Sequence, residues 1–213
     1  MAVRRFGIIT EADARQIEPG ATVELEARGH VTPLAQDTLT ARRVTVVPAG
    51  SVDASLPADL APAAVIARVA IGSDHTGVAL KAALVDHLRK MGKAVTDHGT
   101  LGADPVDYPD IAGAVARAVA RGEADAGIVI DGAGIGSAIA ANKVRGVRAA
   151  LGLNVTLARY AREHNGTNVL TLGASLVSVA EASEIVDTWI STPMREARYI
   201  RRLLKVRRLE DTF

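Results

Sequence analysis

A glycine-spaced turn begins with a carboxylate at residues 131–136, where the sequence reads DGAGIG. It lies between AGIVI, an apolar run typical of a strand, and SAIAANK, which is typical of a helix. Alternate glycines let a ligand approach the backbone, and a helix start offers unpaired N–H groups. The spacing differs from the dinucleotide pattern G-x-G-x-x-G, and the next strand, GVRAALG, lacks a terminal acidic residue. The turn therefore predicts a different anion site, with a purely structural turn as the alternative.

Polar side chains also occupy three other places near the ends of expected strands and helices, and two arginines lie one turn apart on the last helix. They are Asp74 with His75, Asp107 with Tyr108, His164 with Asn165, and Arg198 with Arg202. The i, i+4 spacing of the two arginines puts both guanidinium groups on one helix face, where they could grip a phosphate. Each group also has an ordinary interpretation, because helix arginines are commonly solvated and helix-terminal histidines commonly cap carbonyls.

The elements that position these groups form a regular series from residue 65 onward. Strands are expected at 65–74, 93–99, 126–132, 146–152 and 168–174, with helices between them. Five strands separated by helices predict an α/β fold with a parallel sheet covered on both faces. Ligands of such folds bind at the carboxyl ends of the strands, so the polar groups are expected to converge there, including His164 and Asn165.

The first fifty residues predict a small α/β extension before this series. A helix is expected from Thr10, with Asp13 completing a capping box, and a second helix from Thr32 and Pro33. The strands ATVELEA and VTVV accompany them. Residues 51–64 are rich in Pro, Ala, Asp and Ser and predict a linker, which leaves 65–213 as the main domain.

Composition excludes several classes of function. The chain has 25 basic and 24 acidic side chains, so nothing in its net charge of +1 favours nucleic acid or an anionic membrane as a partner. It has no cysteine, which excludes disulfides, thiolate metal sites and thiol nucleophiles. No apolar run reaches about 18 residues and none resembles a signal peptide, so we expect a cytoplasmic protein.

Five separated motifs carry a resemblance over about residues 66–208. In chain order they are SDHTGVALKAAL, VDYPD, GIVIDGAGIGSAIAANKVRGVRAAL, AREHNGTNVLTLGA and RYIRR. Together they resemble the ribose-5-phosphate isomerase B and galactose-6-phosphate isomerase family. The resemblance implies a three-layer, flavodoxin-like α/β/α sandwich, assembled as a dimer or tetramer with active sites shared between subunits. It also implies interconversion of an aldose phosphate and a ketose phosphate, ribose 5-phosphate first among them, without a metal or organic cofactor.

The resemblance also implies a role for each polar group. His164 would open the sugar ring, a task suited to an imidazole pKa near ~6.5. Phosphate would be bound by His75, Arg198 and Arg202, and sugar by Asp74 and Asn165. Tyr108 would line the pocket, with a packing role equally open. Backbone N–H groups would bind the enediolate, and they belong to Gly132, Gly134, Gly136 and Ser137.

The chain departs from the family at the catalytic base. Family members usually have a cysteine where this chain has Asp131, and some have a glutamate where it has Ser137. Ala133 replaces a usual hydroxyl residue, and Ser175 stands where some members have an arginine. Asp131 could be the base, although its ordinary pKa lies ~4.6 units below that of a thiol. Burial would raise that pKa, and the helix dipole would lower it.

A second hypothesis keeps sugar-phosphate binding without independent turnover. The A subunit of heteromeric galactose-6-phosphate isomerases resembles this chain in having an aspartate before a G-A-G turn, whereas its partner keeps the cysteine. The chain would then be a non-catalytic or partner-dependent subunit. The extension at 1–50 contains HVTPLAQDTLTARRV, which resembles segments of bacterial microcompartment enzymes. This similarity predicts binding to the microcompartment shell, and an oligomerisation or lid-like appendage is the alternative.

Overall fold

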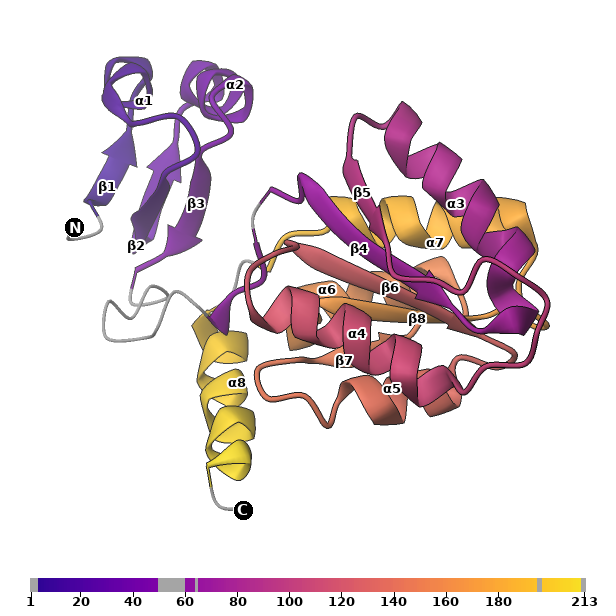
Figure 1. Ribbon diagram of the computed structural model, residues 1–213. Helices are drawn as coiled ribbons and strands as arrows, with labels where there is room; N and C mark the ends of the chain where they lie inside the picture. Colours follow the sequence, from indigo (N-terminus) through magenta and orange to yellow (C-terminus); the bar gives the residue numbers. More distant parts are fainter. Residues whose placement is uncertain (1–3, 50–59, 64, 195–196, 212–213) are drawn as a thin grey trace. The chain divides into compact units, whose positions relative to one another are not determined.

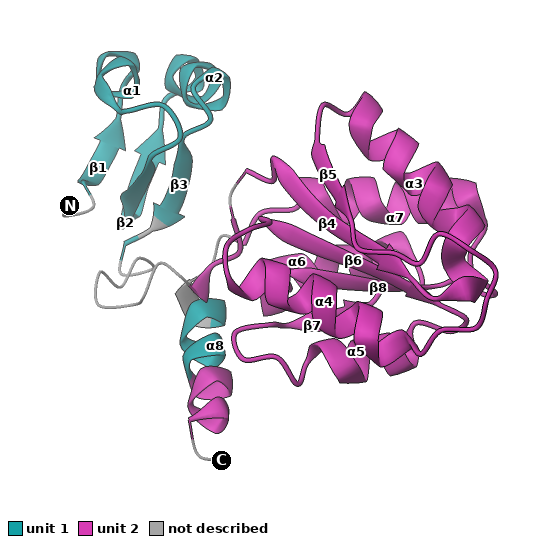
Figure 2. Ribbon diagram, in the orientation of Figure 1, with its two compact units in different colours: residues 1–59, 195–204 teal, residues 60–194, 205–213 magenta. Residues whose placement is uncertain are grey.

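The computed structural model describes residues 4–49, 60–63, 65–194 and 197–211. The chain divides into two compact units, one of residues 1–59 with 195–204 and one of 60–194 with 205–213 (Figure 2). Most of the predicted linker at 51–64 lies outside the described residues, and its described part, 60–63, belongs to the larger unit. None of the described helices is both long enough and apolar enough to cross a membrane.

The smaller unit contains a three-stranded parallel sheet and two helices. In chain order the elements are β1 (Arg5–Ile9), α1 (Glu11–Gln16), β2 (Thr22–Val31), α2 (Pro33–Ala41) and β3 (Thr45–Pro48). The capping box of Thr10 and Asp13 is present, and Pro33 begins α2 as predicted. The strand β1 was not predicted from the sequence. Its residue Ile9 is fully buried in a core with Ala14, and these contacts give the unit an apolar centre of its own.

The larger unit is built on five parallel strands. They are β4 (Arg68–Ser73), β5 (Ala94–Asp97), β6 (Ala126–Asp131), β7 (Ala149–Leu151) and β8 (Val169–Gly173), in the spatial order β5-β4-β6-β8-β7. Every neighbouring pair is parallel. Five strands and parallel pairing confirm the predicted sheet.

Helices cover both faces of this sheet (Figure 1). They are α3 (Val78–Lys90), α4 (Tyr108–Ala120), α5 (Ile135–Ala141), α6 (Val155–Asn165) and α7 (Val179–Ser191). Apolar residues of α3, α6 and α7 share one buried cluster with β4, β6 and β8, and those of α4 and α5 share another. The three-layer α/β/α class is therefore confirmed.

The order of the last two strands differs from that of flavodoxin. Flavodoxin places its strands in the order 2-1-3-4-5, whereas here the fourth strand of the unit, β7, lies outside the fifth, β8. All five residues of β8 are buried, while β7 has three residues that are each half-buried. A short, partly exposed strand suits the edge of a sheet, and a continuous apolar strand suits its centre.

The remaining elements are a short 3-10 turn and the last helix. The turn, η2 (His75–Gly77), connects β4 to α3. The last helix, α8 (Ala197–Glu210), is divided between the two units at residues 204 and 205 (Figure 2).

Candidate functional site

Asp131 is the last residue of β6, and its carboxylate caps the turn that follows. Oδ1 accepts the N–H groups of Ala133, at 2.8 Å, and of Gly134. Oδ2 accepts the N–H of Ser137 at 2.9 Å. The turn can fold back in this way because Gly134 has φ +76°, a left-handed conformation that favours glycine. The backbone N–H groups of the turn therefore bind an anion that belongs to the chain itself, the carboxylate of Asp131.

These hydrogen bonds use backbone N–H groups that the family resemblance assigns to the enediolate. Of the four predicted N–H groups, those of Gly134 and Ser137 donate to Asp131 in the described structure. Those of Gly132 and Gly136 are not among its donors. The resting turn thus satisfies part of its hydrogen-bonding capacity internally, a feature that the residue types alone did not indicate.

The electrostatic balance at Asp131 lowers its pKa below the ordinary value of an aspartate. Burial raises the pKa, since only 5% of the residue is exposed. Hydrogen bonds from Ser137, and from the backbone of Gly134 and Ala133, stabilise the charged form and prevail. The sequence predicted that burial and the helix dipole would oppose each other, and in the structure hydrogen bonds are what outweigh burial. Asp131 is therefore ionised at neutral pH, and it is a weak base.

Asp74 forms a similar cap on the neighbouring strand. It follows β4, and its Oδ1 accepts the N–H and hydroxyl of Thr76, at 2.9 and 2.5 Å, and the N–H of Gly77 at 3.2 Å. The backbone N–H of Asp74 donates to the carbonyl of Ile130, the residue before Asp131. The register of β4 and β6 thus brings the two buried carboxylates to the same edge of the sheet. Thr76 was not predicted as part of this group.

His75 and Tyr108 lie at this edge as well. The Nδ1 atom of His75 accepts the backbone N–H of Val106 at 3.4 Å, which connects η2 to the loop before α4. Tyr108 begins α4 and is 39% exposed. A Cβ atom added to Gly136 would lie 2.6 Å from Cζ of Tyr108, so the tyrosine ring rests against the glycine turn. Both a pocket-lining role and a packing role for Tyr108 agree with this position.

His164 and Asn165 lie at the opposite edge of the sheet. They end α6, whose next residue, Gly166, caps the helix with φ +54° just before β8 begins. The His164 ring stacks on Tyr160 with centroids 4.7 Å apart, and Asn165 Nδ2 donates to the carbonyl of Tyr160 at 3.1 Å. The Gly166 carbonyl accepts a hydrogen bond from Arg148, which precedes β7. These contacts place the pair at the amino ends of the strands.

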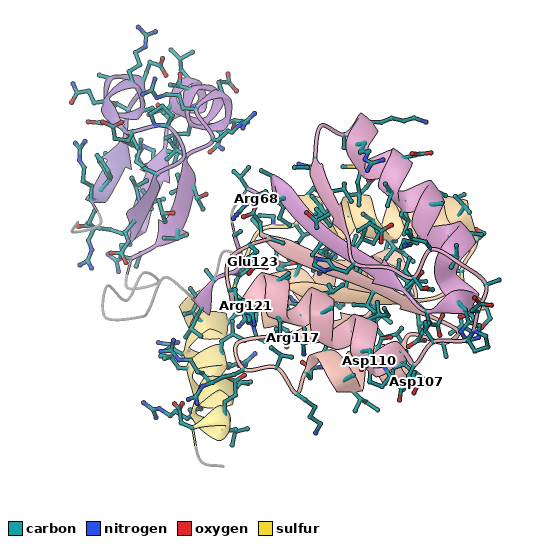
Figure 3. All side chains as sticks on the ribbon, in the orientation of Figure 1. Arg68, Asp107, Asp110, Arg117, Arg121 and Glu123 are labelled. Carbon is teal, nitrogen blue, oxygen red and sulfur yellow. The ribbon has the colours of Figure 1, made fainter. Side chains whose placement is uncertain are left out.

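The predicted convergence of His164 and Asn165 with the turn is therefore wrong within one chain. The register pairs Asp131 with Gly173 at the end of β8, whereas His164 lies before the start of β8. Five residues of strand separate the two edges, about 13 Å at ~3.3 Å per step. A helix that connects parallel strands runs back across the sheet, so its last residues must lie at the amino edge. Figure 3 shows this return for α4: Asp107 lies at the start of the helix, and Arg121 lies at its end, near Arg68 at the start of β4.

The predicted phosphate ligands Arg198 and Arg202 are on α8. The side chain of Arg198 lies outside the described residues. Arg202 is exposed in the smaller unit, with its guanidinium carbon 5.7 Å from the ring centroid of Tyr199. The phosphate-binding role of both residues stays a prediction.

A second polar group, which was not predicted, lies beside β5. Lys81 is 2% exposed, and its ammonium binds both carboxylate oxygens of Asp97, at 2.6 and 2.7 Å, and the Thr100 carbonyl at 2.8 Å. A neighbouring pocket of about 320 Å³ is lined by α3 and the loop after β5, and none of the predicted site residues lines it. The described residues contain no group of three or more His, Asp or Glu side chains placed to hold a metal ion.

The fold and the turn define a class of protein: a three-layer α/β protein with an anion-binding turn at the carboxyl ends of its parallel strands. Residues 69–206 match the family described as Ribose/Galactose Isomerase, and the chain belongs to this family of isomerases. Ribose-5-phosphate isomerase B of Escherichia coli is 41% identical over 144 residues, which cover 68% of this chain and 97% of the relative. Its counterpart in Mycobacterium tuberculosis is 41% identical over 138 residues, 64% of this chain and 85% of the relative.

Solved structures agree with this assignment. Ribose-5-phosphate isomerase B of Clostridium thermocellum superposes with a TM-score of 0.67 at 47% identity, covering 68% of this chain and 97% of that one. The Mycoplasma genitalium enzyme, solved with bound ribulose-5-phosphate, gives a TM-score of 0.66 at 38% identity, with coverage of 68% and 97%. The similarity leaves the smaller unit's sheet unmatched, since the family begins at residue 69. The targeting or oligomerisation role of residues 1–50 stays a prediction.

Proposed function

We propose that the chain is an aldose–ketose isomerase of sugar phosphates, with ribose 5-phosphate and ribulose 5-phosphate as its substrate pair. The observation that carries the proposal is the match to ribose-5-phosphate isomerase B over 97% of that enzyme's length. The anion-binding turn at the carboxyl edge supports it, because an enediolate intermediate is an anion that needs such donors. The bound ribulose-5-phosphate of the Mycoplasma genitalium relative points to the same class of ligand.

The proposed active site is completed by a second copy of the chain. One copy would provide Asp131 and Asp74 from its carboxyl edge, and the other would provide His164 and Asn165 from its amino edge. The separation of these edges within one chain supports shared sites in a homodimer or tetramer. Large apolar side chains exposed on α5 and α6 offer a contact surface, and they are Ile135, Ile139, Leu157 and Tyr160.

In the proposed chemistry, His164 opens the sugar ring by proton transfer. The C2–H bond then breaks: the proton goes to Oδ2 of Asp131, the electron pair forms the C1–C2 double bond, and the π pair of the C1 carbonyl moves onto O1 to give an enediolate. The O2 proton moves to O1, and Asp131 returns its proton to C1 to give the ketose. Gly132 and Gly136 would donate to the enediolate oxygens, while His75, Arg198 and Arg202 would bind the phosphate.

A specific observation favours a second candidate function, a sugar-phosphate-binding subunit without independent turnover. The Asp131 carboxylate is nearly inaccessible, accepts hydrogen bonds from three N–H groups and has a lowered pKa. A general base works best when its pKa lies near the operating pH. On this alternative, turnover would need a family member that carries the cysteine.

Exchange of the C2 hydrogen of ribose 5-phosphate with solvent deuterium tests the proposal. Wild-type protein alone should exchange, Asp131→Asn should not, and both should bind the sugar phosphate equally. Asp86→Asn, which alters an exposed carboxylate on α3, serves as the matched control and should exchange normally. Binding without exchange, together with turnover on adding a cysteine-bearing relative, would establish the partner-dependent subunit instead. Neither binding nor exchange with any pentose, tetrose or hexose phosphate would refute both candidates.

A further inference from the structure

Two arginines at the amino edge of the sheet each bind two segments of backbone. Arg148 donates from Nε to the Gly166 carbonyl at 3.0 Å and from a terminal nitrogen to the Leu60 carbonyl at 3.1 Å. Arg162 donates to the Thr167 carbonyl at 2.7 Å and to the Ala63 carbonyl at 2.8 Å. Each guanidinium therefore joins residues 60–63 to the turn at 166–167.

Arg162 has an unusual environment for a cation. It is 1% exposed, and among the described residues it forms no ion pair with an Asp or Glu. Burial, with the charge of Arg148, lowers its pKa to about 10. Its partners are the two carbonyls and the ring of Trp189, whose centroid lies 5.2 Å away. A buried guanidinium needs such acceptors, so the loss of one would disturb the remaining contacts.

The two segments differ in origin. Residues 60–63 precede residue 69, where the match to the isomerase family begins, and thus belong to the part of the chain that leads in from the extension. The turn at 166–167 directly follows His164 and Asn165. Leu60 is 3% exposed, so its buried side chain holds the incoming segment in addition to the hydrogen bonds.

We propose that residues 60–63 are a positioning segment for the active site, which Arg148 and Arg162 couple to the turn that directly follows His164 and Asn165. The segment fixes the end of α6, and with it the direction of the imidazole. The catalytic part rests on the proposed function, in which His164 opens the sugar ring. Because His164 acts in ring opening and the phosphate is bound by other residues, loosening the segment lowers kcat more than it raises KM, even though Asn165 contacts the sugar.

Substitution of Leu60 in the full chain tests the coupling. Leu60→Ser weakens the hold on the incoming segment, and Leu60→Ala is a milder variant that keeps the test valid if the serine variant misfolds. Leu34→Ser is the matched control, because Leu34 is 61% exposed in the smaller unit. Amide hydrogen exchange of residues 163–168 should be about tenfold faster in the Leu60 variants than in wild type, and unchanged in the control.

Activity measurements then separate positioning from simple support of the structure. We expect kcat with ribose 5-phosphate to fall about tenfold in the Leu60 variants with KM within about twofold, as for an interaction realised in the transition state. Unchanged exchange at residues 163–168 would overturn the coupling, and faster exchange with unchanged kcat would overturn the positioning role. If wild-type protein turns over no sugar phosphate, the proposed function fails by itself, and the exchange result still decides whether the coupling exists.

Discussion

Replacing Asp131 by asparagine should destabilise the larger unit by about 3 kcal/mol at pH 7. The asparagine carbonyl can keep the N–H groups of Ala133 and Gly134, whereas its amide nitrogen cannot accept the N–H of Ser137. A hydrogen bond to a charged group contributes roughly 1.5–3 kcal/mol, and a buried unpaired donor costs about 1–3 kcal/mol. Loss of the hydrogen bond from Ser137, and weakening of those from Ala133 and Gly134, give the expected destabilisation of about 3 kcal/mol. This corresponds to roughly a hundredfold change in the unfolding equilibrium constant.

The effect should depend on pH in a defined direction. Folding lowers the pKa of Asp131, so its contribution is fully present above the unfolded value near ~4 and is lost as pH falls through the folded pKa. The difference between wild type and Asp131→Asn should therefore be largest near neutral pH and should shrink below pH ~4. All other carboxylates titrate in both proteins and cancel from the difference.

Urea unfolding followed by the fluorescence of Trp189 measures this difference. Trp189 is the chain's single tryptophan and is fully buried in the larger unit, so its signal reports that unit despite the second one. Asp86→Asn, an exposed carboxylate on α3, should change stability by less than about 0.5 kcal/mol. Equal stability of wild type and Asp131→Asn at pH 7, or a difference that persists in acid, would refute the assigned role of the carboxylate.

Three further substitutions test the surroundings of the turn and of α6. Gly134→Ala should lower the stability of the larger unit by about 3 kcal/mol in urea unfolding. The reason is that φ of this residue is +76° and the new Cβ would lie 3.0 Å from the carbonyl carbon of Leu172. Thr167→Val should cost about 2 kcal/mol in the same assay, since Trp189 Nε1 donates to the threonine hydroxyl at 2.8 Å. Gly136→Ala should change stability by less than about 1 kcal/mol but raise KM severalfold, because the Tyr108 ring must move from its position 2.6 Å away. Unchanged stability of Gly134→Ala or of Thr167→Val, or an unchanged KM of Gly136→Ala, would contradict the contact concerned.

Much of the fold follows from periodicity in the sequence. Strand segments such as AGIVI and NVLTLG are predominantly apolar, which is typical of strands buried on both faces. The missed strand β1 is short and contains Gly7, so it lacks a clear pattern. The order of β7 and β8 is a tertiary property, and only the lower burial of β7 indicates it.

The placement of some candidate residues followed from the sequence, whereas the hydrogen bonds of the turn and the edge on which His164 lies did not. The expectation that polar groups gather at the carboxyl ends of strands is met by Asp74 and Asp131, which directly follow or end a strand. It fails for His164, which ends a helix, because a helix between parallel strands returns to the amino edge. The hydrogen bonds of Asp131 depend on the left-handed conformation of Gly134, and a pattern of alternate glycines does not specify which glycine adopts it.

The hydrogen bonds of Asp131 are compatible with its proposed role as base because of where the charge goes. In the resting turn, the negative charge lies on Asp131 and holds the N–H groups of Gly134 and Ser137. In the proposed mechanism, Asp131 becomes neutral when it takes the C2 proton, and the same unit of charge appears on the enediolate oxygens. The total charge at the turn is unchanged, so donors released by the neutral acid can bind the enediolate in the same step. A thiol accepts hydrogen bonds weakly and would leave these donors for the substrate from the outset. If Asp131 is the base, the low pKa of its resting carboxylate reflects donors that the proposed reaction withdraws, and Asp131 becomes more basic as the transition state forms.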